Sequence, residues 1–230
     1  MDIYLEIGKT RTFAVALDWP GWCRSGPEEA SALQALFDYA PRYARALQAA
    51  QLPFHPPSHT SALVVVERLA GNATTDFGAP SLAVSRDTQP VAPAELQRFQ
   101  RVLEACWNTF DTAAQAAAGQ ALRKGPRGGG RDLAKMIEHV GDVDAAYLRS
   151  LGGKPRPPEE VDLSQTLSQV RQDILVTLMA AVRGEVPARG PRGGERWTPR
   201  YFVRRLAWHE LDHAWEIEDR IERPAQNLNP

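Results

Sequence analysis

Two histidines four residues apart form the pattern in this sequence that is richest in chemistry. His209 and His213 lie in the stretch LAWHELDHAWEIEDR, which contains His-Glu-x-x-His. On a helix this spacing places both imidazoles on one face, one turn apart. In many metalloproteases the two histidines bind zinc and the intervening glutamate, here Glu210, acts as general base. The pattern predicts a metal site and raises the question whether the chain is a protease.

A third histidine supplies the ligand that the pair lacks. His139 lies in MIEHVGDVDAAYLRSLGG, on the apolar stripe of a predicted helix. His139 lies about eight residues into its helix and His209 about eleven into its own, so each imidazole is about 12 to 17 Å from a helix end. The three can therefore meet in the middle of a bundle. Three neutral imidazoles and an open position are typical of a catalytic divalent metal, which lowers the pKa of a bound water or thiol.

The residues after His213 disfavour a protease. The short protease motifs have a glycine three residues after the second histidine, where the chain turns back; here that residue is Glu216. Asp219 stands at the position of a third ligand, but a straight helix would carry it past the metal. Glu216 shares the face of the two histidines, and Asp212 shares it less closely. We predict both as catalytic residues that orient a ligand or transfer a proton, Glu216 also being a candidate ligand.

Helical periodicity in the second part of the chain positions these residues. Thr198 followed by Pro199 is a helix-start signal, and Pro224 is expected to end that helix. Asp162 or Ser164 is expected to cap the helix before it. Stretches of about 20 residues with apolar stripes recur, at 93–119, 131–153, 162–184 and 198–223. The pattern predicts an all-α four-helix bundle over residues 93–223.

The first part of the chain mixes strands and helices. DIYLEI and TFAVALDW are joined by GKTR and predict a hairpin. A helix is expected to start at Pro27 and to break near Pro41. SALVVVERL is a candidate strand, and LAVSR is a second one. Residues 1–88 are therefore predicted to form a small α+β module before the bundle.

Composition favours a globular protein of a reducing compartment. Hydrophobic residues make up 43% and charged residues 24% of the chain, as in proteins with a packed core. The net charge of −1 gives no electrostatic reason to expect nucleic acid or a membrane as partner. Two cysteines make no disulfide framework. Since no segment of about 18 apolar residues and no leader-like start appears, we expect a cytoplasmic protein with a small-molecule substrate.

The stretches MIEHVGDVDAAYLRSLG and RYFVRRLAWHELDHAWEIEDR resemble the DinB-like superfamily, which includes mycothiol-dependent maleylpyruvate isomerases and bacillithiol transferases. The resemblance covers about residues 93–223, and the family's metal histidines match His139, His209 and His213. It implies a bundle that binds zinc, nickel or iron and often acts with a low-molecular-weight thiol. It also implies a crossover between the second and third helices. GGKPRPPEEVD is long enough for that connection, but simple up-and-down order remains open.

The stretch TFAVALDWPGWCRSGPEEASALQAL resembles the HicB antitoxin fold. The matching positions are Asp18, Pro20, Gly21, Glu28 and Glu29. This resemblance implies an accessory module, or one through which a homodimer forms.

Two similar loops, RKGPRGGGRD and ARGPRGGERW, each precede a helix that carries histidine. Arg127 and Arg192 in these loops are candidates for attracting an anionic substrate, and solvated arginines are the equal alternative. The leading hypothesis is a metal-dependent thiol transferase, isomerase or hydrolase. The alternatives are a non-catalytic binding or regulatory protein that uses the HicB-like module, and the protease.

Overall fold

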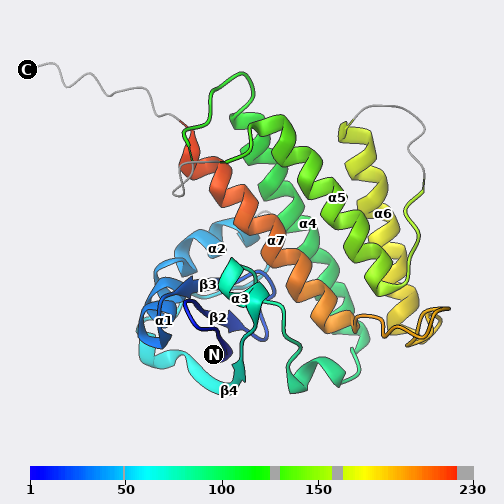
Figure 1. The fold of residues 1–230 in the computed structure, drawn as a ribbon, viewed down its shortest axis with the longest axis horizontal. Helices are drawn as coiled ribbons and strands as arrows, with labels where there is room; N and C mark the ends of the chain where they lie inside the picture. The colour runs from blue at the N-terminus through cyan, green and yellow to red at the C-terminus, as the bar shows by residue number, and fades with distance from the viewer. Residues whose placement is uncertain (49, 125–129, 157–162, 222–230) are drawn as a thin grey trace, which may run out of the picture.

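A mixed four-stranded sheet forms the amino-terminal part of the computed structural model (Figure 1). The structure describes residues 1–230 except 49, 125–129, 157–162 and 222–230. The strand order is β3-β2-β1-β4, with β1 antiparallel to β2 and parallel to β4. The strands are β1 Asp2–Ile7, β2 Thr12–Ala16, β3 Cys23–Gly26 and β4 Val64–Ala70. The predicted hairpin and the strand in SALVVVERL are confirmed, whereas β3 was not predicted.

Three helices accompany this sheet: α1 Glu29–Asp38, α2 Ala40–Gln48 and the short α3 Ala73–Phe77. The break between α1 and α2 at Tyr39 confirms the interruption expected near Pro41. The expected strand at LAVSR is wrong, because a 3₁₀ turn covers Ser85–Thr88. The Asp87 carboxylate accepts the backbone N–H of Val84 at 2.8 Å, and this local bond competes with strand pairing.

Four long helices follow in the part of the chain that the structure describes, as the sequence predicted: α4 Pro93–Ala116, α5 Leu133–Leu151, α6 Leu163–Val182 and α7 Pro199–Arg220. Asp132 caps α5 by accepting the N–H of Lys135, and Gly152 ends it with a φ of 110°. Ser164 lies inside α6 and is therefore not its cap. Asp162 and Pro224 lie outside the described residues.

The helix directions confirm the crossover topology. A Cβ on Gly141 of α5 would lie 3.3 Å from Leu167 near the start of α6, and Gly153, just after α5, lies against Thr177 farther along α6. The two helices therefore run in the same direction, so the end of α5 and the start of α6 lie at opposite ends of the bundle (Figure 1). Because Glu95 near the start of α4 pairs with Arg200 near the start of α7, these two helices are also parallel to each other.

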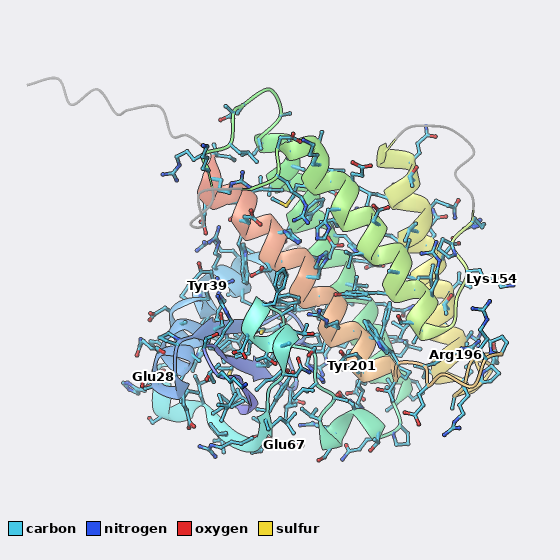
Figure 2. All side chains as sticks on the ribbon, in the orientation of Figure 1. Glu28, Tyr39, Glu67, Lys154, Arg196 and Tyr201 are labelled. Atoms are coloured by element: carbon cyan, nitrogen blue, oxygen red, sulfur yellow. The ribbon has the colours of Figure 1, made fainter. Side chains whose placement is uncertain are left out.

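The sheet and the bundle share one core. Trp22 is fully buried, and the turn before it packs on α7: a Cβ on Gly21, whose φ is +92°, would lie 2.9 Å from Leu211. Tyr201 of α7, labelled in Figure 2, donates a hydrogen bond to the backbone oxygen of Ser81. α7 is thus held between the module and the other helices. None of the described helices meets the length and apolarity that a membrane span requires.

Candidate metal centre

Three histidines from two helices meet in the bundle. His139 of α5 and His209 and His213 of α7 offer ligand atoms that all lie within 4.8 Å of one another. The centroids of the three rings are 4.5 to 5.3 Å apart. A zinc ion bound at about 2.0–2.1 Å from each nitrogen needs only a small inward movement of these rings. The structure therefore brings together the three histidines that the sequence singled out.

The protonation of these imidazoles suits a cation. Burial, and then the neighbouring His213 and His139, hold the pKa of His209 well below its usual range. Burial and His213 also lower the pKa of His139. Both rings are therefore neutral near pH 7, and a metal needs neutral imidazoles. His209 Nδ1 is buried and has no hydrogen-bond partner among the described residues, and such a nitrogen inside a histidine cluster fits a metal ligand.

Glu216 fixes one of these imidazoles. His213 Nδ1 lies 3.3 Å from Glu216 Oε2, and Glu216 Oε1 accepts a hydrogen bond of 2.8 Å from Arg220. The hydrogen bond from His213 is the main reason why the pKa of Glu216 lies below its usual value. This contact leaves His213 Nε2 free to bind an ion, which is the usual role of a carboxylate behind a metal-bound histidine. The structure thus gives Glu216 an orienting position.

A pocket of about 670 Å³ lies over the histidines. Asp212 is in its wall and pairs with Arg24 of β3 at 3.3 Å. The amino-terminal module forms this part of the wall, to which Phe77 also contributes with 76% of its surface exposed. Sequence reasoning missed that contribution. It also missed Arg205, although Arg205 precedes His209 by four residues and so shares its helix face.

Of the two loop arginines predicted to attract an anionic substrate, only Arg192 is among the described residues. Arg127 lies outside the described residues. Arg192 is exposed and is not among the pocket residues. Its loop lies at the far end of α5, where Trp197 donates a backbone hydrogen bond to Ser150 (near the labelled Arg196 in Figure 2). Gly130 and Arg131, which precede α5, therefore lie at the other end of that helix from this loop.

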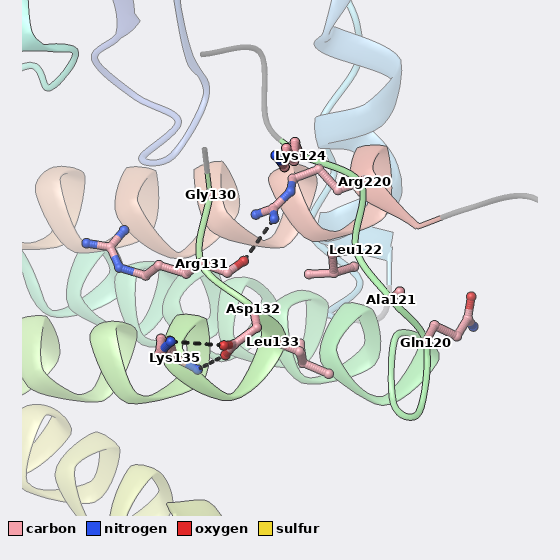
Figure 3. Close-up of a pocket in the computed structure, with 10 residues that line it drawn as sticks. All are labelled: Gln120, Ala121, Leu122, Lys124, Gly130, Arg131, Asp132, Leu133, Lys135 and Arg220. Atoms are coloured by element: carbon pink, nitrogen blue, oxygen red, sulfur yellow. Dashed lines mark hydrogen bonds and ion pairs between the residues drawn. The ribbon is translucent and has the colours of Figure 1, made fainter. Parts of the chain in front are cut away.

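A second pocket of about 760 Å³ adjoins the first (Figure 3). Both pockets are bounded by Gly130, Arg131 and Arg220, and Arg220 Nη2 donates to the backbone oxygen of Arg131 at 2.8 Å. Lys124 and Gly130 line the second pocket, and the residues between them, 125–129, lie outside the described residues. Because the histidines line only the first pocket, that pocket is the candidate site.

Glu210 faces away from the histidine pocket. Its side chain is fully buried, it is not among the pocket residues, and its Oε2 lies 3.8 Å from Arg171 of α6. Burial and the neighbouring Asp144 raise its pKa well above the usual value. A protease base must instead contact a metal-bound water as a carboxylate. α7 also continues without a turn from His213 to Arg220. The arrangement does not support the protease alternative.

Glu210 belongs to a buried carboxyl pair with Asp144 of α5. Both side chains are fully buried, and burial raises the pKa of Asp144 to about 7. None of their four carboxyl oxygens has a donor among the described residues. A proton shared between the two groups supplies the missing donor, as expected for carboxyls that cannot both ionise. Arg171 provides the nearby positive charge.

This pair predicts an unusual pH dependence of stability. The pKa of Asp144 is about 7 in the folded protein against a usual value of 3.8. Between these values the folded state keeps a proton that the unfolded state has released, so raising the pH destabilises the fold by up to about 1.4 kcal/mol per unit. This contribution is fully present below about pH 4 and lost above about pH 7. Denaturant titrations of chelator-treated protein measure it.

Variants that lack the Asp144 and Glu210 carboxyls separate their pH dependence of stability from that of other titrating groups. Glu216, whose pKa is lowered, stabilises in the opposite sense, because its contribution is lost as the pH falls. The double variant Asp144→Asn/Glu210→Gln retains Glu216 and is expected to lose the decline between pH 4 and 7. The variants Asp144→Asn and Glu210→Gln, measured singly, show how much of this decline in stability each carboxyl causes. Equal slopes in the wild type and the double variant would contradict the prediction.

Residues 102–217, half of the chain, match the family model of the DinB superfamily. The matched segment includes all three histidines and most of the four-helix bundle. The amino-terminal sheet lies outside it, so the HicB resemblance stays a prediction. No match to a curated protein or to a solved structure was found.

Proposed function

The chain belongs to the DinB superfamily, and we propose that it is a divalent-metal-dependent enzyme that transfers a thiol to a small molecule or isomerises one with a thiol. The observation that carries the proposal is the cluster of His139, His209 and His213 at the floor of a pocket of about 670 Å³. Three imidazole ligands leave coordination positions open, as catalytic sites require.

The metal would supply Lewis acidity and lower the pKa of a thiol or water placed next to it. Zinc, nickel and iron all suit imidazole ligands, and zinc also suits a thiolate. The two free cysteines, Cys23 and Cys106, are buried, and burial holds the pKa of each thiol well above its usual value. The reacting thiol is therefore proposed to come from a cosubstrate.

The two acidic residues of the pocket wall are proposed to have different roles. The carboxylate of Glu216 is hydrogen-bonded to His213 and Arg220, so Glu216 would position the imidazole of His213. Among the described residues, Asp212 forms an ion pair with Arg24, at 3.3 Å, and with no other cation, and 39% of its side chain is exposed. Asp212 is therefore the better candidate for accepting a proton from a thiol in the pocket.

Metal analysis of protein purified without an affinity tag tests the proposal. We expect one divalent ion per chain, removed by a chelator and restored by adding zinc, nickel or iron. Turnover of an electrophilic small molecule should then require both the ion and an added thiol. A chain that neither retains nor rebinds a stoichiometric ion would refute the metal site. An ion without thiol-dependent turnover would favour a binding protein instead.

A further inference from the structure

The charges of the histidine pocket do not balance. Three carboxylates lie in its wall, and each is already paired with an arginine. Asp212 pairs with Arg24, Glu216 with Arg220, and Asp219 with Arg42. The wall also contains Arg205 and Arg131, for which no described carboxylate lies within ion-pair distance. A bound divalent cation would add to this excess of positive charge, so the pocket favours an anion.

Arg205 is the better placed of the two unpaired arginines. Its guanidinium lies 4.6 Å from the centroid of the Trp208 ring and 5.5 Å from that of Tyr147. Both aromatic side chains line the pocket. Stacking on aromatic rings fixes a guanidinium without using its in-plane donors. Arg205 Nη1 is buried, and the described residues offer it no hydrogen-bond acceptor, which is costly unless a ligand or a small rearrangement supplies one.

The same aromatic side chains connect Arg205 to the metal ligands. The Tyr147 and Trp208 rings lie 5.8 and 6.1 Å from the ring of His209. Arg205 and His209 are one helical turn apart, so their backbone positions differ by about 6 Å along α7. A molecule that reaches both the guanidinium and an ion on the histidines must therefore be short.

Arg131 contributes charge rather than a rigid contact. Its side chain is exposed, and Figure 3 shows no interaction of its guanidinium with the residues drawn, while its backbone oxygen binds Arg220. An exposed arginine attracts an anion from solution but holds it weakly, because water screens the charge. The specific contact is thus assigned to Arg205.

We propose that Arg205, held between Tyr147 and Trp208, binds the carboxylate of a small organic acid whose other end reaches the ion on the three histidines. The inference rests on the proposed metal site and names the substrate class that the site accepts. The planar fork of the guanidinium matches a carboxylate through two parallel hydrogen bonds. Neither of the loop arginines suggested by the sequence is needed for this contact.

Cobalt-loaded protein and short thiols of matched length test the proposal. Cobalt(II) gives an absorption band when a thiolate binds it. The probes are 3-mercaptopropionate and 4-mercaptobutyrate, each compared with its uncharged amide. In the wild type we expect at least one acid to bind about tenfold more tightly than its amide, as a charge-assisted hydrogen bond implies. Arg205→Gln should remove this preference, and Arg205→Lys should keep part of it.

Arg149→Gln is the matched control, because Arg149 is an exposed arginine of α5 outside the pocket. It should leave the preference for the acid unchanged. A preference that is absent from the wild type, or as large in Arg205→Gln, would overturn the proposal, provided that circular dichroism shows the variant folded. If cobalt does not bind, the metal site alone has failed. Calorimetry then measures how tightly the metal-free protein binds each acid and its amide. Tighter binding of an acid than of its amide, lost in Arg205→Gln, supports the anion site. Equal binding of acid and amide overturns it.

Discussion

A His139→Ala variant is expected to fold normally and to bind a divalent ion at least about a hundredfold more weakly than the wild type. Loss of a carboxylate behind a metal-bound histidine already costs about 10- to 100-fold in affinity, so loss of a ligand should cost no less. His139 is the only ligand of the cluster from α5, and it is partly exposed. Its removal therefore leaves two imidazoles on one helix. Competition with a chromophoric chelator measures the affinity.

Two further variants are compared with His139→Ala: one with an intermediate expected loss of metal affinity, and one control. Glu216→Gln keeps the side chain's shape but weakens its hold on His213, so an intermediate loss of about 10- to 100-fold is expected. His59→Ala is the control, because His59 is exposed and is not part of the cluster. Addition of zinc should raise the melting temperature of the wild type and of His59→Ala, but barely that of His139→Ala. A His139→Ala protein that retains its ion would contradict the three-histidine site.

The histidine cluster was predictable because helix periodicity fixes it. His209 and His213 share a face through their spacing alone, and the apolar stripe around His139 indicated which side of its helix faces the bundle. The crossover was permitted by the length of the connection but not required by it. The positions of Gly141 against Leu167 and of Gly153 against Thr177 establish that α5 and α6 are parallel.

The walls of the pocket were not predictable in the same way. Arg24 and Phe77 reach the site because the sheet packs on α7, and no local pattern indicates how two separate elements will pack. β3 is short, and only its first residue, Cys23, is buried, so its alternation is too weak to read. The LAVSR segment has strand-forming residues, but the bonds of Asp87 to Val84 and Arg204 hold it in a turn.

Glu210 shows how a motif can mislead. Its place between the two histidines matches a protease base, yet one residue along a helix turns the side chain by about 100° from each neighbour. It therefore faces Asp144 of α5 and Arg171 of α6, behind the metal cluster. The three residues of this network are visible in the sequence, but they lie on three different helices, α5, α6 and α7, so only the fold brings them together.

Replacing Arg171 with methionine is expected to lower the free energy of unfolding by about 3–5 kcal/mol. Its Nη1 donates to Asp111 at 2.8 and 2.9 Å, and its Nη2 lies 3.8 Å from Glu210. Removing one partner of a buried ion network leaves the remaining charge uncompensated, which has an effect of this size. Methionine keeps most of the apolar stem, so little of the loss reflects lost packing. Denaturant titration at pH 7 measures the change.

The controls separate lost charge compensation from lost contacts. Asp111→Asn removes the partner whose side chain is 40% exposed, and it should cost about 0–1 kcal/mol. Arg171→Met combined with Asp144→Asn and Glu210→Gln should regain most of the stability, because it buries amides instead of charges. Below about pH 4 both carboxyls carry protons in the folded and the unfolded state, so the single variant should approach the wild type there. If the stability lost in Arg171→Met is recovered neither below about pH 4 nor in the triple variant, Arg171 stabilises the bundle by packing rather than by charge.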